Sequence, residues 1–215
     1  MLNFVDYPNR EEWLKNRVNT LGASEVSCVL GMGFQTQLDL WNVKTGKVKP
    51  KDLSDNEKVR YGTDAEENLR ALFALKNKDK YLIEYNPYRV YNHEKYPYLT
   101  ATLDGELTRV EDNAKGVWEC KTVWVNSSRV LEDWNGRIPD KYYIQVCEQL
   151  GITGYAFAAV TVELIFPDGN SEIRNYTIAR SKQVESDIKY VETEAVKWWS
   201  EYVVKGKKPP VRLTI

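Results

Sequence analysis

Three charged residues, Asp104, Glu119 and Lys121, have the types and spacing best suited to chemistry in this sequence. Side chains alternate faces along a strand, so Glu119 and Lys121 should project from one face and Cys120 from the other. A hairpin that turns over residues 111–116 would bring Asp104 beside Glu119. Two neighbouring carboxylates repel unless a cation neutralises them, and hard oxygen ligands suit Mg²⁺ or Mn²⁺. We therefore predict a carboxylate and lysine site in which Lys121 orients, or helps to deprotonate, a metal-bound water.

The Glu-x-Lys pair has an ordinary alternative explanation, because such a pair in a strand is commonly a solvated ion pair. The flanking residues favour the chemical interpretation, since a surface pair is not usually bordered by apolar residues on both of its strands. The apolar flanks are Val117, Trp118 and Val123 in one segment and Leu99, Ala101 and Leu103 in the other.

The sequence contains a single histidine, His93, and three separated cysteines. These counts exclude zinc sites built from histidine pairs and iron–sulfur clusters that need four thiolates. A Ser-His-Asp or Cys-His hydrolase would have to use His93, and no G-x-S-x-G motif is present. Any bound metal should therefore have oxygen ligands.

The 215 residues include 30 basic and 31 acidic side chains, for a net charge of −1, so any basic surface must be local. We expect a single domain over residues 1–215. No run approaches the roughly 18 apolar residues that a membrane span needs. The first ten residues lack the apolar core of a signal peptide, so we expect a soluble cytoplasmic protein with reduced cysteines and no membrane partner.

The first third of the chain and its end have helical patterns with recognisable caps. One long amphipathic helix should carry Glu66 near its start, after a capping box at residues 54–57 and a restart beyond Gly62. The other predicted helices run from Asn9 to Arg17, from Gly22 to near Gly31, from Gln37 to Lys44, from Pro139 to Gly151 and from Ser181 to Gly206.

The middle of the chain is rich in aromatic and β-branched residues, which favours strands. The predicted strands are residues 81–91, 98–107, 117–123, 155–165 and 172–178, with the second and third forming a hairpin. The segment 155–165 is apolar almost throughout, as in a buried central strand. The expected fold class is therefore α/β or α+β, with a mixed sheet flanked by helices.

Several ordered motifs extend beyond this pattern. Asp104-Gly105 followed by Glu119-Cys120-Lys121 has the spacing of the PD-(D/E)xK nuclease core. The other motifs are Trp13, Arg17 and Gly22-Ala23-Ser24-Glu25, the stretch from Gly31 to Gly46, Tyr61-Gly62-Thr63-Asp64-Ala65-Glu66, and residues 138–145 followed by Thr153-Gly154. Over roughly residues 9–165 the sequence resembles the YqaJ-like viral recombinase family, which includes phage lambda exonuclease. The resemblance implies a restriction-endonuclease-like core.

The sequence departs from the family pattern at three places. Leu103 stands where the family has Pro before the strand-end Asp, and Glu67 follows Glu66 where lambda-like members often have Pro. Residues 50–60 match poorly, and in this family that region can touch DNA.

The resemblance implies a role for each matching residue. Asp104, Glu119 and the Cys120 carbonyl would bind metal, and Glu66 would support a second ion. Lys121 would activate or position the attacking water, and Gln145 would orient Lys121 or the water. Arg17 and Ser24 would bind the 5′ phosphate of the degraded strand, which suits a guanidinium and a hydroxyl near a helix start.

The function implied by the resemblance is an Mg²⁺-dependent 5′→3′ exonuclease with two ions, for which Mn²⁺ can substitute. It would degrade linear double-stranded DNA from its ends in phage recombination, leave 3′ single-stranded overhangs and act beside a single-strand annealing protein. Family members form ring-shaped trimers, so a homo-oligomer is expected. Two alternatives remain: an endonuclease with the same core, for restriction or branched DNA, and a catalytically inactive DNA-binding protein.

Overall fold

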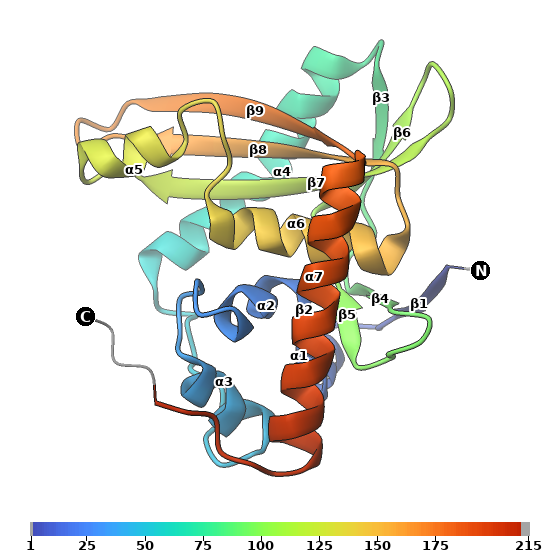
Figure 1. Ribbon diagram of the computed structural model, residues 1–215. Coiled ribbons are helices and arrows are strands. Elements are labelled where there is room, and N and C mark those ends of the chain that lie inside the picture. Colours follow the sequence, from blue (N-terminus) through green and yellow to red (C-terminus); the bar gives the residue numbers. More distant parts are fainter. Residues whose placement is uncertain (1, 212–215) are drawn as a thin grey trace.

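The computed structural model describes residues 2–211, which fold into two mixed β-sheets with helices packed around them (Figure 1). Residues 1 and 212–215 of the predicted single domain lie outside the described part. The predicted α/β class is confirmed. A second, smaller sheet was not predicted.

The larger sheet has the strand order β3-β6-β7-β8-β9. The central strand β7 pairs with β6 as the predicted hairpin and runs parallel to β8. β8 is buried along nearly its whole length, as the apolar run predicted. The strands are β3 (Tyr81–Glu84), β6 (Gly105–Arg109), β7 (Lys115–Trp124), β8 (Phe157–Ile165) and β9 (Ser171–Ala179).

The smaller sheet has the order β1-β4-β5-β2. Its strands are β1 (Asn3–Asp6), β4 (Arg89–Asn92), β5 (Leu99–Ala101) and β2 (Leu21–Gly22). Two predictions of single long strands were therefore wrong: residues 81–91 and 98–107 each divide between the two sheets. The second division matters for function, because the chain leaves β5, crosses to the larger sheet at residues 102–104 and places Asp104 at the crossing.

The helices keep most of their predicted caps. The Asn9, Thr36 and Ser181 side chains each accept a backbone N–H at a helix start, as predicted. The helices are α1 (Arg10–Asn19), α2 (Ala23–Val29), α3 (Gln37–Lys44), α4 (Glu57–Asn77), α5 (Ser128–Asp133), α6 (Asp140–Thr153) and α7 (Lys182–Trp198), and α7 continues as the π-helical segment η1 (Trp199–Val204).

The predictions for two helices need correction. Asn56 caps α4 by accepting the Lys58 and Val59 N–H groups, so the capping box predicted from Ser54 was wrong. The helix α4 does not restart at Gly62 but passes through it, because tertiary packing presses this turn against β7, where a Cβ on Gly62 would lie 3.0 Å from Thr122 Oγ1. The helix α6 does not end at Gly151 but at Gly154, whose φ of 70° is the left-handed conformation that closes helices. Pro139 is its cap residue, not its first helical residue.

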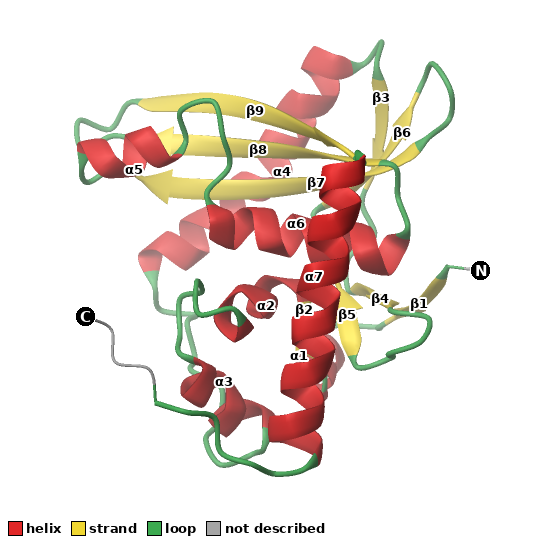
Figure 2. Ribbon diagram, viewed as in Figure 1, coloured by secondary structure: helices red, strands yellow, loops and turns green. Residues whose placement is uncertain are grey.

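The helices α4 and α6 cover opposite faces of the larger sheet. Leu69 and Phe73 of α4 pack with Trp118, while Ile144 of α6 belongs to the core cluster that contains Val117. Because side chains alternate along β7, Glu119 and Lys121 lie on the α6 side. Figure 2 shows α7 crossing α6 and running past the smaller sheet toward α3. Within residues 2–211, no helix is both long and apolar enough to cross a bilayer.

Candidate active site

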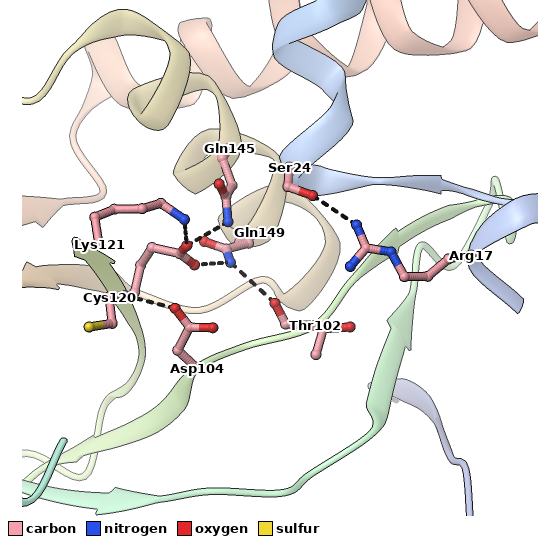
Figure 3. A network of polar contacts seen from close by, with 9 residues as sticks. Arg17, Ser24, Thr102, Asp104, Cys120, Lys121, Gln145 and Gln149 are labelled. Atoms are coloured by element: carbon pink, nitrogen blue, oxygen red, sulfur yellow. Dashed lines mark hydrogen bonds and ion pairs between the residues drawn. The ribbon is translucent and has the colours of Figure 1, made fainter. Parts of the chain in front are cut away.

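Glu119 is the centre of a polar network with Lys121, Gln145 and Gln149, three side chains that Figure 3 labels. The residue is only 1% exposed, yet both carboxylate oxygens have hydrogen-bond partners. Gln145 Nε2 donates to Oε1 at 2.6 Å, and Lys121 Nζ pairs with the same oxygen. Gln149 Nε2 donates to Oε2 at 2.6 Å and reaches the Thr102 carbonyl oxygen at 3.3 Å. Three donors from β7 and α6 therefore fix this carboxylate, and the chain crossing holds one of them through the Thr102 carbonyl.

Asp104 lies beside this network, as the hairpin predicted. Its Oδ2 accepts the Cys120 backbone N–H at 2.8 Å. Burial, and next the neighbouring Glu119 charge, raise the pKa of Asp104 well above its ordinary value. A cation placed here would relieve that repulsion.

Lys121 is the cation that the structure already supplies. Burial acts to lower its pKa, but the carboxylates of Glu119 and Asp104 outweigh burial and raise the pKa above the ordinary lysine value. Its ammonium also lies 5.4 Å from the ring centroid of Tyr142. A lysine held in its charged form is better suited to orienting a water and stabilising negative charge than to removing a proton.

Glu66 of α4 lines the same cleft as Asp104 and Glu119. Its Oε1 accepts Arg70 Nη1 at 3.0 Å, and the same nitrogen donates to the Asp104 carbonyl oxygen at 2.8 Å. Burial raises the pKa of Glu66, and Arg70 opposes that effect. Arg70 therefore ties the α4 carboxylate to the chain crossing.

A separate cationic group lies at the start of α2. Arg17 Nη2 donates to Ser24 Oγ at 3.2 Å (Figure 3). The guanidinium carbon lies over the Trp13 ring, 4.9 Å from the ring centroid. Buried Lys44 connects α1 to α2 at this place, since its Nζ lies 2.7 Å from the Arg17 carbonyl oxygen and 2.7 Å from Glu25 Oε2.

The two groups open into one cleft of about 280 Å³. Its lining includes all seven side chains singled out in the sequence, namely Arg17, Ser24, Glu66, Asp104, Glu119, Lys121 and Gln145. Cys120 differs: its thiol packs on the α4 side and its backbone N–H holds Asp104. The roles of these residues remain predictions, but their proximity is a finding.

The donor set fits a hard divalent cation such as Mg²⁺. Glu66, Asp104 and Glu119 line one cleft and offer only oxygen, and the raised pKa of Asp104 reflects negative charge that a cation would offset. Across residues 2–211, however, no three His, Cys, Asp or Glu side chains gather as a ready-made metal cage. The Glu119 oxygens would have to be shared between a cation and the glutamine and lysine donors.

Three residues that hold the site together, Gln149, Arg70 and Thr102, were not predicted. Gln149 and Arg70 each stand four residues after a predicted site residue on the same helix, Gln145 and Glu66 respectively, so they share its face. That spacing was the available signal. No sequence signal pointed to Thr102, because its role depends on how the chain crosses between the two sheets.

Comparisons with known proteins identify the family and the fold. Residues 12–156 match the YqaJ-like viral recombinase domain. Protein YqaJ of Bacillus subtilis (strain 168) is 26% identical over 206 residues, which cover 94% of this chain and 59% of that protein. This chain thus spans about three fifths of the length of that relative.

Solved exonuclease structures share the fold. The alkaline exonuclease LHK-Exo from Laribacter hongkongensis superposes with a TM-score of 0.63, and LHK-Exo in complex with dAMP with 0.66. Both are 18% identical and cover 91% of this chain and 93% of their own. A phage related exonuclease from Haemophilus somnus 129PT gives 0.51 at 13% identity, covering 90% of this chain and 100% of its own. With two thirds of its residues matched, the chain belongs to the YqaJ-like viral recombinase domain family.

Proposed function

We propose that this chain is a divalent-metal-dependent exonuclease that degrades one strand of linear double-stranded DNA from its 5′ end and leaves 3′ overhangs. One observation carries the proposal: a single cleft joins a carboxylate and lysine group to a separate cationic group. A phosphodiester at the first group and a terminal phosphate at the second would place one end of a strand in the cleft. Family membership and the fold shared with exonucleases support the same chemistry.

The reaction is a hydrolysis. Water attacks the phosphorus, the bond to the 3′ oxygen of the terminal nucleotide breaks, that oxygen takes a proton, and the next nucleotide keeps a new 5′ phosphate. Lys121 is positioned to orient the water and to offset charge on the phosphate. Gln145 and Gln149 hold Glu119 in one conformation. When bound by Asp104, Glu119, Glu66 and the Cys120 carbonyl, Mg²⁺ would supply Lewis-acid stabilisation of the developing charge, with two ions in the arrangement that we favour.

At the other end of the cleft, Arg17 and Ser24 would bind the 5′ phosphate. A guanidinium stacked on Trp13 and paired with a hydroxyl presents N–H and O–H donors to an anion. We further propose that the protein works in phage recombination in the bacterial cytoplasm, as a ring-shaped homotrimer beside a single-strand annealing protein.

The test is digestion of linear duplex labelled at either the 5′ or the 3′ end, with Mg²⁺ or with chelator. We expect 5′ label to be released first, only with metal, and Asp104→Asn to lower the rate at least about a hundredfold. Asp112→Asn, an exposed carboxylate on the same hairpin, is the matched control. Full activity of the Asp104 variant would refute the site, and similar cutting of a supercoiled circle would favour the endonuclease alternative.

A second variant tests whether the protein begins at the 5′ end of a strand. Arg17→Ala should slow digestion of 5′-phosphorylated ends by roughly ten- to a hundredfold, because a charged hydrogen bond to phosphate is lost. Ends that carry a 5′ hydroxyl should be digested at nearly the wild-type rate for such ends. Lys15→Ala, an exposed cation on the same helix, is the control. Equal slowing on both ends would contradict a phosphate-binding role.

A further inference from the structure

The wall of the cleft between its two charged groups is aromatic. It is formed by Tyr85 and Tyr88, in the segment between β3 and β4, which no part of the proposed hydrolysis uses. Both side chains line the same cleft as Arg17 and Asp104.

The two rings lie at different ends of this wall. Tyr85 is at the carboxylate end, where the Arg70 guanidinium lies 3.8 Å from its ring centroid. Arg70 is the residue that also contacts Glu66 and the Asp104 carbonyl, so the ring is fixed against the catalytic group. Tyr85 nevertheless remains 45% exposed.

Tyr88 is at the cationic end. Its ring centroid lies 6.2 Å from that of Trp13, the ring over which Arg17 stacks. The backbone is anchored as well, since the Tyr88 carbonyl accepts the Tyr7 N–H at 3.2 Å. The two tyrosines therefore span the distance between the phosphate-binding group and the carboxylates.

Tyr88 has a φ of 61°, the left-handed conformation that favours glycine. A bulky side chain at this position costs free energy, and such strain persists where the surrounding structure enforces it, often at functional sites. The aromatic ring of Tyr88 therefore stands at a position where glycine would give a lower conformational free energy.

We infer that Tyr85 and Tyr88 form the binding surface for the base of the 5′-terminal nucleotide. The inference rests on the proposed function, because a nucleotide with its 5′ phosphate at Arg17 and its 3′ oxygen near Asp104 must extend along this wall. The ligand class is a deoxynucleoside 5′-monophosphate, which is also the product released. Recognition is by stacking on the aromatic surface, which every base can do, so the subsite holds any of the four bases.

Binding can be measured apart from catalysis, in chelator, by titration calorimetry with dAMP and with 2-deoxyribose 5-phosphate, which lacks the base. Tyr88→Gly is the informative variant, because glycine accepts the backbone conformation and removes only the ring. We expect it to weaken dAMP roughly ten- to a hundredfold and to leave the affinity for the sugar phosphate unchanged. Tyr85→Leu should have the same pattern, and Tyr88→Phe should bind as wild type does.

Two results would overturn the inference: equal affinity of the wild-type protein for dAMP and for the sugar phosphate, or unchanged dAMP binding by both Tyr88→Gly and Tyr85→Leu. Arg17→Ala separates this failure from failure of the proposed function. If that variant loses both ligands while the tyrosine variants lose neither, the phosphate site stands and the base subsite falls. A thermal melt confirms that Tyr88→Gly is folded.

Discussion

At the scale of single residues, the buried Glu119 depends on donors from α6. Gln149 is fully buried and supplies the hydrogen bond to Oε2. Replacement by leucine would leave that oxygen without a partner, and an unsatisfied buried charge is costly.

Gln149→Leu should therefore lower the free energy of unfolding by about 1–3 kcal/mol and reduce the nuclease rate at saturating Mg²⁺. Urea denaturation and the end-label assay measure the two effects. The exposed Gln183→Leu on α7 is the control and should change neither. A variant as stable and active as wild type would show that Gln149 does not hold the carboxylate.

Glu148, the residue before Gln149, is also buried. Its Oε1 has no hydrogen-bond partner among the described residues, and burial, together with the charge of Glu192, raises its pKa to about 8. The folded protein thus keeps a proton that the unfolded chain releases near an ordinary carboxyl pKa. Since the unfolded state binds fewer protons between these values, stability falls as the pH rises from about 5 to 8.

Glu148→Gln removes this proton linkage while keeping the shape of the side chain. We expect the variant to match wild type near pH 5 and to be more stable by roughly 2–4 kcal/mol at pH 8, as urea denaturation at the two pH values would show. The exposed Glu67→Gln on α4 serves as control. A stability difference that does not change with pH would contradict the prediction.

At the scale of elements, the start of β6 is packed too closely for a side chain. A Cβ on Gly105 would lie 2.8 Å from Ile83 Cδ1 and 3.2 Å from Trp118 Cε3. Because Gly105 follows Asp104 directly, relief of that clash would move the carboxylate.

Gly105→Ala should thus lose about 1–3 kcal/mol of stability and also lose nuclease rate. Gly154→Ala is the matched control, because it strains a left-handed helix end by about 1–2 kcal/mol where the added Cβ meets open space. It should reduce the melting temperature but not the rate. Equal rates for the two variants would show that β6 does not position Asp104.

The sequence predicted the elements that have strong local signals. Caps and apolar spacing located α1, α3 and α7, and the apolar run located β8. The smaller sheet was missed because its strands have only two to four residues, too few to show alternation. Arg17 and Ser24 came from motif resemblance, whereas Thr102 and Tyr88 depend on long-range packing that no local pattern reveals.

At the scale of the whole molecule, one hydrophobic core joins the two sheets. Leu21 and Leu99 of the smaller sheet belong to the same buried cluster as Val117 and Val160 of the larger sheet. A second cluster, which contains Leu69, Trp118 and Phe157, packs α4 against the other face of the larger sheet. The cluster that both sheets share supports the proposal of a single domain.

We therefore expect one cooperative unfolding transition. Far-ultraviolet circular dichroism and tryptophan fluorescence should give the same midpoint, because buried Trp198 lies in the shared cluster and buried Trp118 lies in the cluster on the other face of the larger sheet. Two separated midpoints would show that the sheets unfold independently.

The chain crossing at Thr102 fixes the distance between the Arg17 region and the Glu119 region. The Thr102 hydroxyl accepts the Trp13 indole N–H at 3.1 Å, while its carbonyl accepts Gln149, so one residue ties the Arg17 region to the Glu119 region. Under the proposed function, these two hydrogen bonds of Thr102 fix the distance between the site of the terminal phosphate and the bond that is cut. Variants that change how fast the protein cuts would then still release one nucleotide at each cut.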